Sequence, residues 1–273
     1  MKPLASAFID LASRINQSGR RHQPPPSERD ELDETWRAML RDSERQFIYG
    51  TTLLSRVRAE HLLYISFLVR RAMQGVAVPD EPHFDEIATP RFLSLIGDCR
   101  FYLEYGSGGS TVLAAALNKP FVSVDTDRLF LESVRRKIGP LTSAQRLLHA
   151  DIGLIGPWGI PFPAGKPSPR RLNKWKAYAQ TPWPFISQDN PPDLILIDGR
   201  FRVATALTCC MHLSARSDVE ILIDDYVDRP SYHVIERHAK LVRVLGRMAV
   251  FHPLRGDQSA LQEAINQYSA DWL

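Results

Sequence analysis

The stretch that decides the fold is residues 102–111, YLEYGSGGST, in which an apolar run is followed by a glycine-rich turn. The composition of the next residues predicts a helix that begins near Ser110. Glycines at 106 and 108 let the backbone approach a ligand where a side chain would clash, and the first turn of the helix presents free N–H groups. The stretch therefore predicts a strand–turn–helix unit that binds a ligand through Gly106, Ser107, Gly108 and Ser110.

The charge of this turn indicates which ligand it suits. Glu104 stands two residues before the first glycine, and Thr111 occupies the position where a dinucleotide-binding GxGxxG pattern needs its third glycine. A carboxylate at the end of a strand disfavours a pyrophosphate and attracts a positively charged group. We therefore expect Glu104 to contact a ligand that carries positive charge.

The sequence pattern beyond residue 90 predicts a parallel sheet, because short apolar runs alternate there with helical patterns. Apolar residues over 203–211 follow the spacing of a buried helix face, and the runs 241–245 and 248–252 favour a closing hairpin. The expected fold class is α/β, with a doubly wound, mostly parallel sheet. Its expected parallel strands are 100–105, 121–125, 146–150, 193–198 and 219–224.

The expected domain organisation has three parts. Residues 1–30 contain three consecutive prolines among polar residues and are predicted to form a flexible arm. Residues 31–90 are predicted to form a helical extension, whose role is to cover a sheet edge, to form a homodimer or to act as a substrate lid. Residues 91–273 form the sheet domain, with a tryptophan-rich insertion at 152–192 that contains a short helix near 172–179.

Composition and charge limit the partners. The 273 residues include 34 Lys and Arg against 31 Asp and Glu, for a net charge of +3. Both signs are interspersed, so we expect no nucleic-acid partner. The longest apolar run has eight residues, whereas a bilayer needs ~20, and the start is a poor secretory signal. We therefore expect no membrane partner. The three cysteines lack metal-binding spacing and are interpreted as packing residues in a reducing compartment, so we expect a cytoplasmic protein.

Acidic residues follow three successive expected strands. Asp125 ends the second strand, nineteen residues after Gly106, where such folds place an acid that accepts both hydroxyls of a ribose. Asp151 follows the third strand and could accept a hydrogen bond from the exocyclic amine of adenine. Together with Glu104, these acids suit one ligand with ammonium, ribose and adenine groups.

Over residues 99–252 the chain resembles the class I S-adenosylmethionine-dependent methyltransferases. The resemblance implies a Rossmann-like sheet of about seven strands and S-adenosylmethionine as cofactor. It also implies that Glu104, Gly106 and Gly108 cradle the methionine part, that Asp125 holds the ribose and that Asp151 lies by the adenine. The alternative is a nucleotide-fold relic in which these acids serve as local caps.

Three further carboxylates close the fourth and fifth expected strands: Asp198 in ILIDGR, and Asp224 and Asp225 in ILIDDY. Carboxylates that converge repel one another unless a cation or protons intervene, and oxygen ligands suit Mg²⁺. The pattern is similar to metal-dependent sugar O-methyltransferases, a resemblance that makes the three acids metal ligands and Mg²⁺ a second cofactor. That group often has Asp or His after the IDG motif, and this chain has Arg200 instead. The alternative is that Asp198 touches the cofactor and the other two make turn bonds.

The expected activity is methyl transfer to a small-molecule acceptor, with oxygen as the favoured atom. Asp198 and His233 are the candidate catalytic residues, His233 as a general base. The basic residues over 170–176, with Arg200 and Arg202, suit an anionic acceptor. The alternatives are a nicotinamide-dependent oxidoreductase and a non-catalytic cofactor-binding or scaffold protein.

Overall fold

The computed structural model describes residues 61, 64–69, 71–73, 75–163, 165–214 and 216–272. The chain divides into two units, Met1–Leu63 and Tyr64–Leu273, and the fold described below belongs to the second. The predicted flexible arm and the predicted helices before residue 61 lie outside the described residues. The homodimer expected through those helices therefore stays a prediction.

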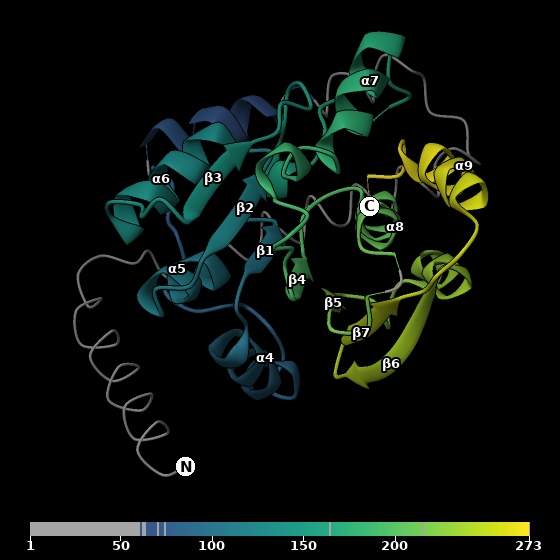
Figure 1. The fold of residues 1–273 in the computed structure, drawn as a ribbon. Helices are drawn as coiled ribbons and strands as arrows, with labels where there is room; N and C mark the ends of the chain where they lie inside the picture. Colours follow the sequence, from purple (N-terminus) through teal and green to yellow (C-terminus); the bar gives the residue numbers. More distant parts are fainter. Residues whose placement is uncertain are drawn as a thin grey trace. The chain divides into compact units, whose positions relative to one another are not determined.

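A seven-stranded sheet forms the centre of the second unit (Figure 1), with strand order β3-β2-β1-β4-β5-β7-β6. The first five strands are parallel, whereas β7 runs antiparallel to both β5 and β6. The prediction of a doubly wound, mostly parallel sheet of about seven strands is confirmed. The strands are β1 (Tyr102–Tyr105), β2 (Phe121–Asp125), β3 (Gln145–His149), β4 (Leu194–Ile197), β5 (Glu220–Ile223), β6 (Ala239–Leu245) and β7 (Met248–Pro253).

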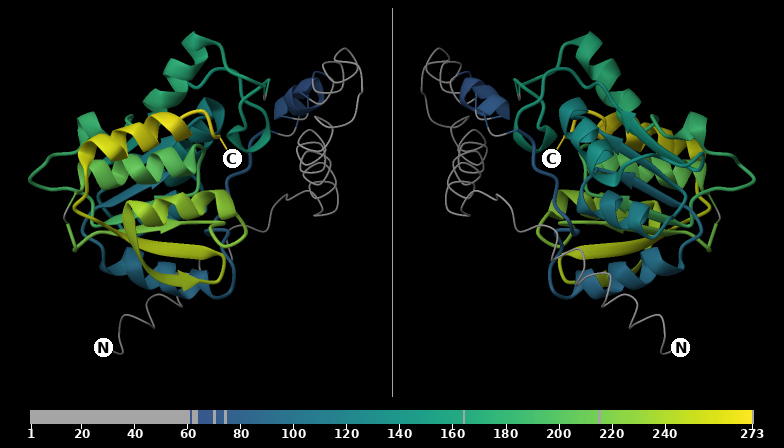
Figure 2. Two further views of the ribbon diagram at one scale, coloured as in Figure 1. Left: turned by 90° about the vertical axis from the view of Figure 1, so that its right-hand side faces the viewer. Right: turned by 90° about the vertical axis from the view of Figure 1, so that its left-hand side faces the viewer.

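Helices cover both faces of this sheet, as the side views in Figure 2 show. One face packs against α7, α8 and α9, and the other packs against α4 and α5. The α-helices of the unit from residue 88 onward are α4 (Ala88–Asp98), α5 (Gly109–Ala116), α6 (Arg128–Ile138), α7 (Pro169–Tyr178), α8 (Arg202–His212) and α9 (Gln258–Tyr268). Short 3-10 helices are η1 (Pro157–Gly159), η2 (Trp183–Phe185) and η3 (Pro230–Arg237).

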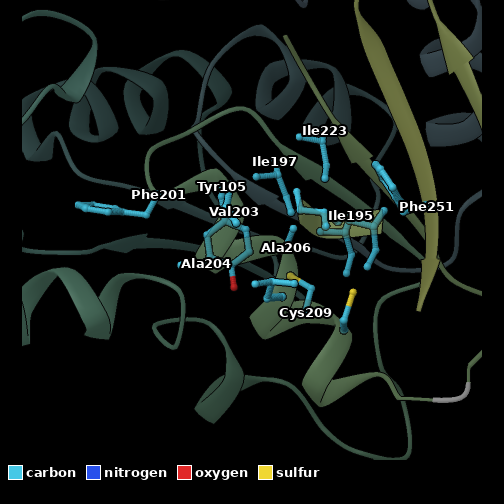
Figure 3. Close-up of a cluster of buried hydrophobic side chains, with 14 of the residues drawn as sticks. Tyr105, Ile195, Ile197, Phe201, Val203, Ala204, Ala206, Cys209, Ile223 and Phe251 are labelled. Carbon is cyan, nitrogen blue, oxygen red and sulfur yellow. The ribbon is translucent and has the colours of Figure 1, made fainter. Parts of the chain in front are cut away.

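The central strands are buried on both faces, which is why their sequences read as continuous apolar runs. Every residue of β4, LILI, is buried. Ile195 and Ile197 contribute to the cluster beneath α8, where they meet Val203 and Cys209 (Figure 3). Full burial of such a side chain stabilises the fold by roughly 1.5–3 kcal/mol. All three cysteines are free and buried, in agreement with their predicted packing role.

The insertion between β3 and β4 is largely ordered by packing. Helix α7 begins at Pro169 because Ser168 caps it, accepting a hydrogen bond from the backbone N–H of Arg171. Trp175 of this helix is buried, and Trp183 stacks on His212 with ring centroids 4.0 Å apart. The predicted short helix is thus confirmed, with its start three residues earlier than expected.

Part of the expected helical extension is described. Residues 64–69 and 71–73 are helical, and Tyr64 stacks on Phe162 of the insertion with ring centroids 4.1 Å apart. Arg71 donates to Asp127, which follows β2, with Nη1 2.6 Å from Oδ2. Within the described residues, no helix combines the length and the apolar character that crossing a bilayer requires.

Candidate active site

The candidate site lies at the edge where the parallel strands end. Because β2, β1, β4 and β5 are neighbours, the turns that follow them meet at this edge. The glycine turn follows β1, Asp125 ends β2, Asp198 follows β4, and Asp224 follows β5. The sheet order thus brings the predicted site residues of four strands to the same side of the molecule.

The two glycines of the turn have different surroundings. Gly106 has φ +99°, and a Cβ there would lie 2.8 Å from both the Asp198 carbonyl carbon and the Gly199 nitrogen. At Gly108 a Cβ would meet nothing within 4 Å among the described residues. Gly106 is therefore required by the close approach of the turns after β1 and β4, and Gly108 is the position open to a ligand.

Glu104 is completely buried and makes its hydrogen bonds within the protein. The Tyr102 hydroxyl donates to Oε2 at 2.9 Å, the Ser110 hydroxyl donates to Oε2 at 2.6 Å, and the Thr111 hydroxyl donates to Oε1. Burial raises the pKa of this carboxyl above its usual value. These contacts hold β1 against the first turn of α5, so they favour a positioning role, and direct contact of Glu104 with a cofactor stays a prediction.

Thr111 stands where a dinucleotide-binding pattern needs a glycine, and the structure gives it a role of its own. Its hydroxyl accepts a hydrogen bond from the backbone N–H of Gly108 at 2.9 Å and donates to Glu104. It thereby links the buried acid to the open glycine of the turn. Thr111 occupies the third position of the helix, from which a capping side chain reaches back to the backbone N–H of the N-cap residue, although Glu or Gln is the usual residue there.

Asp125 is joined directly to the glycine turn. Its carboxylate accepts hydrogen bonds from the backbone N–H of Ser107 at 2.9 Å and of Asp127 at 2.7 Å. Burial raises the pKa of Asp125 to about 7, against the effect of these two hydrogen bonds. The structure thus places the predicted ribose-binding acid and the predicted methionine-binding turn in contact.

Asp151 lies at the end of the neighbouring strand β3. It is exposed, accepts from the Gly153 N–H at 2.9 Å and pairs with Lys174 of α7 at 2.5 Å. The hydrogen bond from Lys174 holds the pKa of Asp151 below its usual range. The carboxylate therefore ties the insertion to the sheet edge, and its contact with adenine stays a prediction.

The carboxylates that follow β4 and β5 are paired with arginines. Arg202, 3% exposed, donates to Asp198 at 2.7 Å and to Asp225 at 3.1 Å. Arg247 forms a fork on the buried Asp224, with Nε and Nη2 at 2.8 and 2.7 Å from its two oxygens. Arg229 also donates to Asp225, at 3.2 Å. We call these six residues the acid–arginine cluster: Asp198, Asp224, Asp225, Arg202, Arg229 and Arg247.

This cluster does not fit the metal site expected from Asp198, Asp224 and Asp225. The positive charge that Mg²⁺ was expected to supply comes from guanidinium groups, which bind at least one oxygen of each of the three carboxylates. Across the described ranges, no group of three or more His, Cys, Asp or Glu side chains is arranged to hold a metal ion. Arg247 lies in the turn between β6 and β7, 23 residues beyond Asp224, where strand motifs give no indication that it pairs with this acid.

The two candidate catalytic residues differ in their surroundings. Asp198 has a side chain that is 36% exposed, and partial burial together with the nearby carboxylates of Asp224 and Asp225 raises its pKa to about 6, although Arg202 opposes the shift. His233 is exposed in η3 and packs on Tyr226, with ring centroids 5.0 Å apart. No contact described for His233 joins it to Asp198, so its role as base stays a prediction.

Arg200, which is expected together with Arg202 to suit an anionic acceptor, is partly buried. Its Nε is buried without a hydrogen-bond partner in the part of the chain that the structure describes. Its backbone N–H donates to the Tyr178 hydroxyl at 3.4 Å. Burial, reinforced by the nearby Arg202, lowers the pKa of Arg200 to about 10.

Comparison with known proteins supports a transferase. No family model matches the chain, and no curated protein matches it. A solved structure of a methyltransferase-like protein from Silicibacter pomeroyi is 26% identical, with a TM-score of 0.60, and the match covers 71% of this chain and 100% of that one. The sheet domain therefore has a methyltransferase-like, Rossmann-like α/β fold.

Proposed function

We propose that the protein is a class I S-adenosylmethionine-dependent methyltransferase that acts on a small-molecule acceptor, with oxygen as the favoured acceptor atom. The observation that carries the proposal is the hydrogen bond between Asp125 and the backbone of Ser107. It joins an acid that ends β2 to a glycine turn that follows β1, and a nucleoside with a charged tail needs both at once. The methyltransferase-like neighbour supports the same conclusion.

The residues present fit the proposed cofactor. A carboxylate offers about four acceptor positions, and Asp125 uses two in the hydrogen bonds described, which leaves capacity for ribose hydroxyls. The open backbone at Gly108 would lie against the methionine part. When bound, S-adenosylmethionine supplies a methyl group that its sulfonium already activates.

The remaining task of the protein is to hold the acceptor and to remove its proton. A general base works best when its pKa lies near the operating pH, and Asp198 has a pKa of about 6 at the end of β4. In this proposal the acceptor hydroxyl gives its proton to the Asp198 carboxylate. Asp198 is favoured over His233 because its backbone packs against Gly106 of the cofactor turn.

Calorimetry with S-adenosylhomocysteine tests the proposal. Wild-type protein should bind it, and Asp125→Ala should weaken binding by about 100-fold or more, because two hydrogen bonds to a charged group are lost. The matched control is Asp189→Ala, which removes an exposed acid before β4 and should bind like wild type.

Other outcomes separate the alternatives. Thermal stabilisation by NADH and not by S-adenosylhomocysteine would contradict the proposal and favour the oxidoreductase. Binding of S-adenosylhomocysteine without methyl transfer to any of a broad acceptor panel would favour a non-catalytic cofactor-binding protein.

A further inference from the structure

Four arginines lie near the ends of β4 and β5, but among the described residues only three carboxylates pair with them. Arg202, Arg229 and Arg247 each bind at least one carboxylate of the acid–arginine cluster. Within the described residues, Arg200 forms no salt bridge, and its Nε is buried without a hydrogen-bond partner. Arg200 is therefore a guanidinium near Arg202 that no carboxylate pairs with among the described residues.

The position of Arg200 is fixed by its backbone. Its N–H donates to the Tyr178 hydroxyl of α7, and Gly199 before it is packed so closely that a Cβ would lie 2.2 Å from the same hydroxyl. Phe201 after it is buried, with its ring centroid 5.5 Å from that of Tyr178. A buried N–H without a partner costs about 1–3 kcal/mol, so the Arg200 guanidinium, which extends from this fixed backbone, is suited to a ligand.

We propose that Arg200 binds an anionic group, a carboxylate or a phosphate, of the methyl acceptor. This rests on the proposed function. The planar guanidinium matches both anions through paired N–H donors. Arg200 follows Asp198 by two residues, so an acceptor anchored there brings its hydroxyl toward the proposed base. On this proposal, the edge of the sheet after β4 and β5, where a metal ion was expected, binds an anionic group of the acceptor.

Two sources of the anion must be distinguished, because the methionine part of the cofactor also carries a carboxylate. The turn after β4 holds Arg200, whereas the open backbone of Gly108 belongs to the turn after β1. As part of the same proposal, Arg200 is assigned to the acceptor, and the test below separates this from contact with the cofactor. On this assignment, replacement of Arg200 leaves the affinity for S-adenosylhomocysteine unchanged.

The test uses inorganic phosphate and benzoate as anionic probes and benzamide as the neutral counterpart. Each is titrated by calorimetry into the full chain, with and without S-adenosylhomocysteine. The variants are Arg200→Gln and Arg200→Lys, and the matched control is Arg255→Gln, which removes the same charge from an exposed position after β7. Wild type and control should bind at least one anion about tenfold more tightly than Arg200→Gln, Arg200→Lys should be intermediate, and benzamide should show no difference.

Several results would overturn the inference. The first is equal anion binding by wild type and Arg200→Gln, and the second is no anion binding by wild type. The third is that Arg200→Gln weakens binding of S-adenosylhomocysteine but not of 5′-methylthioadenosine, which lacks the carboxylate. If both variants fail to fold, the Nε–Hε resonance of Arg200 in wild-type protein decides, since it should shift when phosphate is added. Failure of wild type to bind S-adenosylhomocysteine contradicts the proposed function instead, and the anion titrations without cofactor still decide the role of Arg200.

Discussion

Asp125 combines burial with hydrogen bonds from the turn it is expected to serve. Its pKa of about 7 means that near neutral pH the carboxyl group is divided between its protonated and ionised forms. Only the ionised form accepts hydrogen bonds at both oxygens without displacing a proton. At the scale of single residues, cofactor binding is therefore coupled to the titration of this acid.

The coupling predicts the direction of a pH dependence. Because the ionised form binds the ribose hydroxyls, affinity for S-adenosylhomocysteine should rise with pH, by about tenfold between pH 6 and pH 8 for a pKa of about 7. Asp125→Asn should bind weakly with no such slope. Calorimetry across this range measures both, and a wild-type affinity that is constant or falls with pH would contradict the prediction.

The glycines of the turn provide a matched pair of substitutions. Gly106→Ala should lower the free energy of unfolding by about 2–4 kcal/mol, because the new Cβ meets backbone atoms at a positive φ. Gly108→Ala should change it by less than about 1 kcal/mol and should instead weaken S-adenosylhomocysteine binding. Urea unfolding and calorimetry separate the two effects, and equal destabilisation by both substitutions would be inconsistent with the different surroundings of the two glycines.

At the scale of elements, the fork between Arg247 and Asp224 joins the turn of the β6–β7 hairpin to the end of β5. Asp224 is 1% exposed and Arg247 is 36% exposed, so removal of the arginine leaves a buried carboxylate unpaired. Arg247→Ala should lower the free energy of unfolding by about 2–4 kcal/mol, less than for a pair in which both partners are buried.

The double variant Asp224→Asn/Arg247→Ala provides the control, because it also removes the negative charge that Arg247→Ala alone leaves without a partner. It should recover part of the lost stability in urea unfolding. Arg255→Ala, at an exposed position, should behave like wild type. Additive losses in the double variant would show that the fork does not stabilise the hairpin.

The elements themselves were largely predictable, because buried parallel strands leave continuous apolar runs. The ends of β4 and β5 fall within one residue of the prediction. Strand β1 starts two residues later than predicted, because the N–H groups of Arg100 and Phe101 bind the Asp193 side chain and not a neighbouring strand. Such a bond joins residues more than 90 positions apart, and local pattern carries no trace of it.

At the scale of the whole molecule, the sheet order decides which side chains meet. The approach of Gly106 to Gly199 and the pairing of Arg247 with Asp224 both depend on strands that are distant in sequence. The sequence indicated that acids gather at one edge and favoured Mg²⁺ as the opposing charge, whereas the structure pairs these acids with arginines. Physically, a carboxylate near other carboxylates needs positive charge, and metal ions and arginines meet that need equally well.

A crystal structure of the protein grown with S-adenosylhomocysteine and Mg²⁺ tests the central proposal most directly. The proposal predicts both ribose hydroxyls within hydrogen-bond distance of Asp125, the methionine part against Gly108, and the Arg247–Asp224 fork intact. A nucleoside bound away from Asp125, or a metal ion that displaces the arginines from Asp198 and Asp224, would contradict it.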